Sequence, residues 1–94
     1  MDIFSHTRNK YRGKQEVYAT LLLGVAAEHR GIVLTRLMYI SMISHRQLTS
    51  HLQVLLKHGL LEHNKQEKVY KITTKGLQFL ELYTKMAELL EGVK

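Results

Sequence analysis

The stretch ISHRQLTSHLQVLLKHGLL, residues 43–61, predicts one helix that carries both a start signal and a stop signal. Ser44 is a favourable N-cap because its side-chain oxygen can accept a hydrogen bond from a free backbone N–H of the first turn. Gln47 lies three residues later and can reach back to complete a capping box, while Gly59 suits the left-handed residue that often follows a helix. Between these signals the helix has an apolar face, formed at helical spacing by Leu48, Leu52, Leu55 and Leu56.

The opposite face of this helix carries hydrogen-bond donors and small polar groups, with no carboxylate among them. Its members are His45, Arg46, Thr49, Ser50, Gln53 and Lys57. A helix with an apolar back and a basic, acid-free front is suited to insertion into a DNA groove. The same pattern also fits an ordinary amphipathic surface helix, so the neighbouring segments must decide between the two interpretations.

The whole chain has the size and composition of one small, basic domain. It has 94 residues, a formal net charge of +6 and no cysteine, which excludes disulfides and thiolate metal sites. Residues 1–58 hold eight Lys and Arg against three acids, whereas residues 59–94 hold six against five. This uneven charge favours nucleic acid as the partner. The sequence shows no signal-peptide or membrane-spanning pattern, so we expect a cytoplasmic, nucleoid-associated protein.

The chain begins with a basic segment and a first helix. Residues 1–12 have no apolar periodicity and contain three basic side chains, Arg12 among them, so they fit either a flexible arm that reaches DNA or a frayed terminus. Residues 14–30 carry two adjacent apolar stripes, which predict a helix contacted from two sides. Gly24 in the middle of this helix predicts a close helix crossing, and Gly31 is expected to end it.

A helix-turn-helix is predicted for the middle of the chain. Residues 32–34 are a short β-type run, after which Thr35 is expected to cap a short helix that leads to a turn at Ser41. This short helix, the turn and helix 44–58 make the three parts of a helix-turn-helix.

A hairpin is predicted directly after helix 44–58, because the hydrophobic period changes there from 3.6 to 2. Residues 60–64 and 68–72 are the two strand-like runs, with a polar turn between them. A hairpin in this position is a wing whose tip lies near the phosphates of a bound duplex. Lys65 and Lys68 suit that contact and Glu67 slightly opposes it; an ordinary solvated turn is the alternative.

The last helix is expected to begin after the cap Thr73 and to run to about Leu90, with Gly76 allowing a close approach to a neighbour. It carries two apolar stripes, one made of Phe79, Leu82, Met86, Leu89 and Val93, and the other of Gly76, Leu80, Tyr83, Ala87 and Leu90. The domain can cover one stripe, near Leu77 and Leu80 against the first helix. The remaining apolar surface predicts a homodimer with a coiled-coil seam, whose interface comprises Phe79, Leu82, Tyr83, Met86, Leu89, Leu90 and Val93. The alternative is a helix folded wholly onto its own domain.

Two segments carry a family resemblance: TRLMYISMISHRQLTSHLQVLLKHGLLE (35–62) and KVYKITTKGLQFLE (68–81). They resemble small archaeal winged helix-turn-helix DNA-binding proteins that have a C-terminal dimerising helix. The family pattern T-x-x-M-Y, L-S-x-x-Q-L, L-x-x-L-x-x-x-G-L-I and Y-x-I-T-x-x-G is matched at most of its positions. The resemblance implies a dimer that binds duplex DNA, either as a regulator or as a chromatin-like protein. Two departures are Ile40–Met42, where a basic residue is common, and the number of histidines in the reading helix.

Metal and catalytic sites are not expected. The chain has six histidines, but His51 and His58 lie about 10 Å apart along one helix, and neither a carboxylate nor a thiol is placed to complete a ligand set. We therefore interpret the histidines as solvated or phosphate-facing. The sequence contains no activated nucleophile, no glycine-rich phosphate loop and no apolar carboxylate pair, so it predicts neither enzymatic activity nor a cofactor.

The sequence thus predicts a mainly α, winged helix-turn-helix protein with a basic arm (1–12), a winged domain (13–76) and a dimerisation helix (77–94). It is expected to bind double-stranded DNA as a homodimer, with no membrane or small-molecule partner. The predicted DNA contacts are Arg12, Arg36, Ser44, His45, Arg46, Thr49, Ser50, Gln53, Lys57, Lys65 and Lys68, with Arg46 as the best candidate for a guanine contact. Two alternatives are a winged helix used for protein–protein assembly in transcription or replication, and a repressor with a ligand pocket between the first and last helices.

Overall fold

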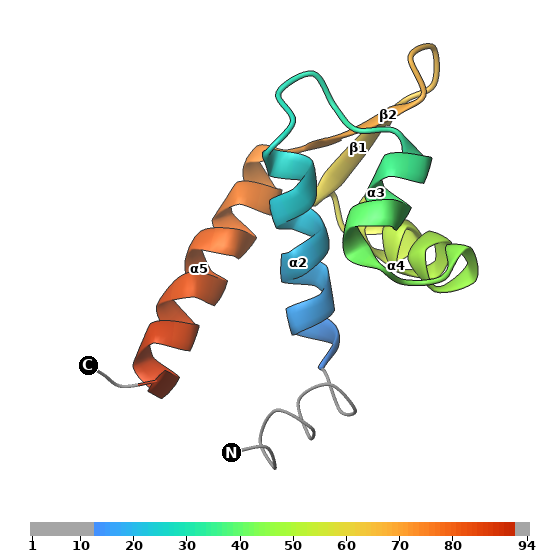
Figure 1. Ribbon diagram of the computed structural model, residues 1–94. Coiled ribbons are helices and arrows are strands. Elements are labelled where there is room, and N and C mark those ends of the chain that lie inside the picture. Colours follow the sequence, from blue (N-terminus) through green and yellow to red (C-terminus); the bar gives the residue numbers. More distant parts are fainter. Residues whose placement is uncertain (1–12, 92–94) are drawn as a thin grey trace.

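The computed structural model describes residues 13–91, and these residues form four helices and one hairpin (Figure 1). In chain order the elements are α2 (Lys14–Ala26), α3 (Leu34–Ser41), α4 (His45–Lys57), β1 (Leu61–Asn64), β2 (Val69–Ile72) and α5 (Thr74–Glu91). This order confirms the predicted winged helix-turn-helix fold. The predicted arm with Arg12, and Val93 of the last helix, lie outside the described residues.

The first helix lies in the middle of the molecule. Figure 1 shows α2 with α5 on one side and α3 on the other, and α5 runs antiparallel to α2. The prediction that this helix is contacted from two sides is therefore confirmed. The close crossing predicted at Gly24 is also present, because a Cβ added there would lie 2.9 Å from Cδ1 of Ile40 on α3.

Two helix boundaries differ from the sequence predictions. α2 ends at Ala26 rather than next to Gly31, because the chain must reverse there to bring Ile32 beside Tyr70; the Gly31 N–H donates to the Glu28 carbonyl within this turn. The second boundary is the start of α3 at Leu34, with Val33 as its N-cap, so Thr35 is not the cap.

The hydrophobic core lies where α2, α3 and α4 meet the base of the hairpin. Its buried members are Leu21, Leu22, Val25, Ile32, Leu37, Leu48, Leu52, Leu55 and Leu61. Leu34 and Met38 pack against this cluster from α3, which requires Leu34 to be helical and explains the early start of that helix. Each helix of the helix-turn-helix thus has one face in the same core.

The hairpin is an antiparallel pair of four-residue strands. Leu61 pairs with Ile72 at its base and Asn64 pairs with Val69 near its tip, which confirms the predicted wing to within one residue at each strand. Ile32 adds an isolated antiparallel bridge to Tyr70, with N–O distances of 2.9 and 2.8 Å. Of the predicted β-type run at 32–34, only Ile32 pairs with the sheet, and this bridge ties the α2–α3 connection to the wing.

The last helix begins directly after Thr73, as predicted, and is continuous from Thr74 to Glu91. Phe79 and Leu80 pack against the core cluster, whereas Leu77, expected to lie against the first helix, is 51% exposed. Gly76 is buried at the start of the helix, as predicted for a close approach. No helix within residues 13–91 is both long and apolar enough to span a membrane.

Candidate nucleic-acid interface

The start of α4 is fixed by the predicted capping box. The Ser44 Oγ accepts a hydrogen bond from the Gln47 N–H at 3.1 Å, and the Gln47 Oε1 accepts one from the Ser44 N–H at 3.4 Å. The Ser44 hydroxyl also donates to the Gln47 Oε1 at 3.3 Å. Three short-range bonds therefore hold the first turn, and the hydroxyl of Ser44 is committed to its own helix.

The end of α4 is a Schellman motif. The Gly59 N–H donates to the Leu56 carbonyl at 3.0 Å, and the Leu60 N–H donates to the Leu55 carbonyl at 2.9 Å. Gly59 has a φ of 75°, the left-handed conformation that glycine adopts without steric cost. The predicted stop signal is confirmed, and α4 is a helix of 13 residues with a cap at each end.

The two faces of α4 separate as the sequence predicts. Leu48, Leu52 and Leu55 are buried, so the back of the helix is anchored in the core. The front side chains that lie exposed are His45, Arg46, Ser50, Gln53 and Lys57. Thr49 is half-buried, and its hydroxyl donates to the Arg46 carbonyl at 3.0 Å. The exposed front therefore presents side-chain donors and two formal positive charges without an acid.

The wing presents two lysines at its tip. Lys65 and Lys68 are exposed, and Asn64 organises the turn that carries them. The Asn64 Oδ1 accepts from the Glu67 N–H at 2.9 Å, and the Asn64 carbonyl accepts from the Lys68 N–H at 2.7 Å. Figure 1 shows the wing tip and α4 on the side of α2 away from α5. The structure thus places α4 and the wing tip on the same side of α2.

Arg36 on α3 is not a free cation. Its Nε lies 3.4 Å from the Glu28 Oε2, and the two side chains are 60% and 39% exposed. Glu28 belongs to the turn after α2, so the eight-residue separation gave no helical spacing from which the pair could be predicted. A pair this accessible to solvent contributes little to stability.

Two of the histidines contact aromatic rings. His51 on α4 is half-buried with its ring centroid 5.5 Å from that of Tyr18, and His63 lies 4.4 Å from Tyr70 on the wing. The interpretation of the histidines as solvated or phosphate-facing is therefore wrong for His51, which faces α2. Within residues 13–91, no group of three or more His, Asp or Glu side chains is placed to hold a metal ion.

α5 presents a row of exposed apolar side chains on the far side of α2 from α3. Leu82, Met86, Leu89 and Leu90 are 67%, 45%, 82% and 80% exposed. Phe79 and Tyr83 are half-buried, with stacked rings 6.4 Å apart. The domain therefore partly covers Phe79 and Tyr83 and leaves Leu82, Met86, Leu89 and Leu90 largely exposed.

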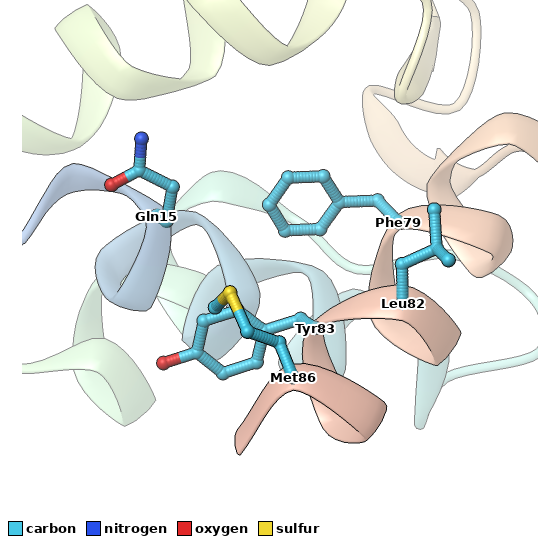
Figure 2. Close-up of a pocket in the computed structure, with 5 residues that line it drawn as sticks. All are labelled: Gln15, Phe79, Leu82, Tyr83 and Met86. Carbon is cyan, nitrogen blue, oxygen red and sulfur yellow. The ribbon is translucent and has the colours of Figure 1, made fainter. Parts of the chain in front are cut away.

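A groove of about 240 Å³ lies beside the exposed row, between α5 and the first turn of α2. In Figure 2, Phe79 extends from α5 toward the α2 side, where Gln15 lies, while Tyr83 and Met86 stand together one turn further along. Leu82 completes the lining. The groove occupies the position considered for a ligand pocket, and four of its five lining residues belong to the predicted dimer interface.

The geometry combines a helix-turn-helix, whose second helix is capped at both ends and has an acid-free front, with a wing tip on the same side of α2. Comparison with curated proteins gave no match. A family model described as winged helix-turn-helix matches residues 11–91, which is most of the chain. Since this match and the architecture agree, the chain belongs to the winged helix-turn-helix family, whose fold is that of a DNA-binding domain.

Proposed function

We propose that this protein binds double-stranded DNA as a homodimer, with α4 in the major groove and the β1–β2 wing on the adjacent phosphates. It acts as a transcriptional regulator or as a chromatin-associated protein. The observation that carries the proposal is the front of α4, where Arg46, Gln53 and Lys57 are exposed on a helix without a carboxylate. A surface that met water alone would have no physical reason to exclude acids, whereas a surface that meets phosphates does.

The exposed side chains divide into two roles. Arg46 lies in the first turn of α4, the part of a recognition helix that reaches base edges, and a guanidinium can bond both acceptors of guanine. His45, Ser50 and Gln53 lie on the same front and supply further contacts to bases or phosphates. The lysines at positions 57, 65 and 68, together with Arg36, position the duplex through phosphates.

The dimer is supported by the exposed row on α5. Burying a leucine or methionine side chain contributes about 1.5–3 kcal/mol, so leaving Leu82, Met86 and Leu89 in water forgoes a large part of the stability of a small domain. The groove beside the row is open and apolar, which suits a large apolar side chain of a second copy. Pairing of the α5 helices about a two-fold axis buries the row and presents two α4 helices to one duplex.

Two measurements test this function. DNA affinity should fall by roughly 10³–10⁵ between 50 and 200 mM salt if a dimer neutralises about six to ten phosphates. Affinity for duplex that barely changes over this range, together with no retention on heparin, would leave protein–protein assembly as the better explanation. Sedimentation equilibrium at tens of micromolar should give the mass of a dimer, and a clean monomer mass would remove the dimer from the proposal.

A further inference from the structure

The end of α4 and the start of α5 meet at the base of the wing through three hydrogen bonds. Three consecutive backbone carbonyls after α4 accept from the first residues of the α5 segment. The His58 carbonyl accepts from the Lys75 Nζ at 2.7 Å, and the Gly59 carbonyl from the Thr73 hydroxyl at 2.6 Å. The Leu60 carbonyl accepts from the Thr73 N–H at 3.2 Å, which continues the ladder of the hairpin. We refer to these bonds as the α4–α5 junction.

One hydroxyl serves both helices in this junction. The Thr73 Oγ1 accepts from the Gly76 N–H at 3.0 Å, which caps α5, while it donates to Gly59 beyond the end of α4. Gly76 allows this approach, because a Cβ at that position would collide with the Leu60 carbonyl oxygen and lie 2.6 Å from the Ile72 Cγ1. The cap of α5 is therefore also a tie to α4, unlike the cap of α4, whose bonds stay within its own helix.

The stiffness of this junction affects the position of the far end of α5, because the helix is long. A helix of 18 residues is about 27 Å long, so a rotation of about 10° at its base moves its far end by about 5 Å. That displacement exceeds the rise of about 3.4 Å between neighbouring base pairs. The angle between α4 and α5 is held by this junction at the base of α5 and by the packing of Phe79 and Leu80 on the core. In a dimer paired through α5, that angle decides which separation of DNA half-sites both α4 helices can reach.

We propose that Thr73 and Lys75 are positioning residues that fix the angle between α4 and α5 and thereby set the half-site separation that the dimer accepts. The first part concerns one chain alone. The second part rests on the proposed function, because it requires both the α5 dimer and DNA binding by α4.

The first experiment measures the angle within one chain. The protein has no cysteine, so nitroxide labels can be placed at Gln53→Cys on α4 and Glu88→Cys on α5, both at exposed positions. Labelled protein diluted into an excess of unlabelled protein reports only the intramolecular distance in double electron–electron resonance. The variant Thr73→Val with Lys75→Met should broaden or shift that distance distribution by about 4 Å, because the label lies about 21 Å from the base of α5. An unchanged distribution would overturn the proposal.

Matched variants separate a specific tie from general damage. Thr84→Val with Lys85→Met makes the same two substitutions further along α5 and should leave the distribution unchanged. Thr73→Ser in the otherwise wild-type chain keeps the hydroxyl and should give the same narrow distance distribution as the wild type. Lys75→Met alone removes one exposed hydrogen bond and retains the packing of the side-chain stem near Gly59, so this variant remains folded and should give a smaller effect in the same direction. Broadening in the Thr84 and Lys85 control equal to that in the junction variant would contradict the assignment.

The second experiment measures the consequence on DNA. Half-sites selected from a random duplex library are placed at a series of separations, and the affinity of the dimer is measured for each. The wild type should bind one separation best, since engaging both sites at once contributes about 10²–10⁴ in affinity. The junction variant should lose at least about tenfold of this preference while its affinity for a single half-site changes less than about twofold. If the junction variant keeps the wild-type preference for one separation, the role of the junction in setting half-site separation is overturned. If the wild type does not dimerise or does not bind DNA, the proposed function is contradicted, and the label distances alone test whether Thr73 and Lys75 fix the angle between α4 and α5.

Discussion

α4 and α5 are both amphipathic helices attached to the same domain, but they present opposite chemistry to solvent. α4 buries its leucines in its own core and exposes donors and cations. α5 rests only part of its apolar surface on the domain and exposes Leu82, Met86, Leu89 and Leu90. The core of one chain therefore accounts for the apolar residues of α4 and not for those of α5. The front of α4 therefore suits the polyanion of the proposed function, and the exposed row on α5 is the surface that the proposed dimer buries.

A charge placed in the exposed row of α5 should have the largest effect, which is on dimer stability. In the proposed dimer each subunit buries its Leu82, so we expect Leu82→Glu to weaken that dimer by about 3–6 kcal/mol, or roughly 10²–10⁴ in dissociation constant. Sedimentation equilibrium over a range of concentrations measures the change. Thr84→Glu adds the same charge to α5 outside the row and should leave dimerisation intact. Equal weakening by both variants would mean that net charge, and not the row, controls association. Truncation after Leu80 should also give a monomer with much weaker DNA binding.

The same truncation of a leucine should have different consequences on the two helices. Leu52 on α4 is 2% exposed, and Leu52→Ala should lower the free energy of unfolding by about 2–5 kcal/mol at every protein concentration. Leu89 on α5 is 82% exposed, and Leu89→Ala should change the unfolding free energy of the monomer by less than about 0.5 kcal/mol. Urea denaturation of dilute protein measures both. A large loss from Leu89→Ala in the monomer would show that the row is already covered within one chain.

The front of α4 can be tested by separating base contacts from phosphate contacts. Arg46→Ala should cost about 1–3 kcal/mol of DNA binding and relax the sequence preference at one base position. Lys65→Ala on the wing should weaken binding to all duplexes alike and reduce the salt dependence slightly. Lys85→Ala, on the exposed face of α5, is the control and should have no effect. Equal, sequence-independent losses from Arg46→Ala and Lys65→Ala would favour a chromatin-associated protein over a regulator that reads bases.

The contrast between the helices also explains what the sequence could predict. Both ends of α4 were predicted because their signals are local: Ser44, Gln47 and Gly59 act within a few residues of the helix they bound. The end of α2 was not predicted correctly, because it depends on the pairing of Ile32 with Tyr70, 38 residues further along the chain. The interpretation of His51 as solvated or phosphate-facing was wrong because its ring contacts Tyr18 of α2, and a contact across 33 residues has no local signal in the sequence.

The α4–α5 junction could be predicted only in part. Thr73 was predicted as the cap of the last helix, and that bond to the Gly76 N–H is present. Its second bond, to the Gly59 carbonyl, crosses 14 residues and depends on the wing closing between them. The cap could be predicted because its partner lies three residues away in the sequence. The bond between the two helices could not, because its partners come together only once the wing has folded.

The smallest predicted effect concerns Ser44 and sharpens the description of α4. Ser44 was predicted as a DNA contact, yet its hydroxyl bonds the Gln47 side chain and backbone. Ser44→Ala should therefore cost about 0.5–2 kcal/mol of unfolding free energy, the usual loss for a serine N-cap, and change the DNA affinity of the folded protein less than about twofold. Ser50→Ala is the matched control, because Ser50 is exposed in the middle of the front and caps nothing; it should alter DNA binding and leave stability within about 0.5 kcal/mol. Thermal unfolding and duplex titration at fixed salt measure the two quantities for each variant. If Ser44→Ala lowers DNA affinity as much as Ser50→Ala while leaving stability unchanged, the hydroxyl of Ser44 leaves its cap to contact DNA.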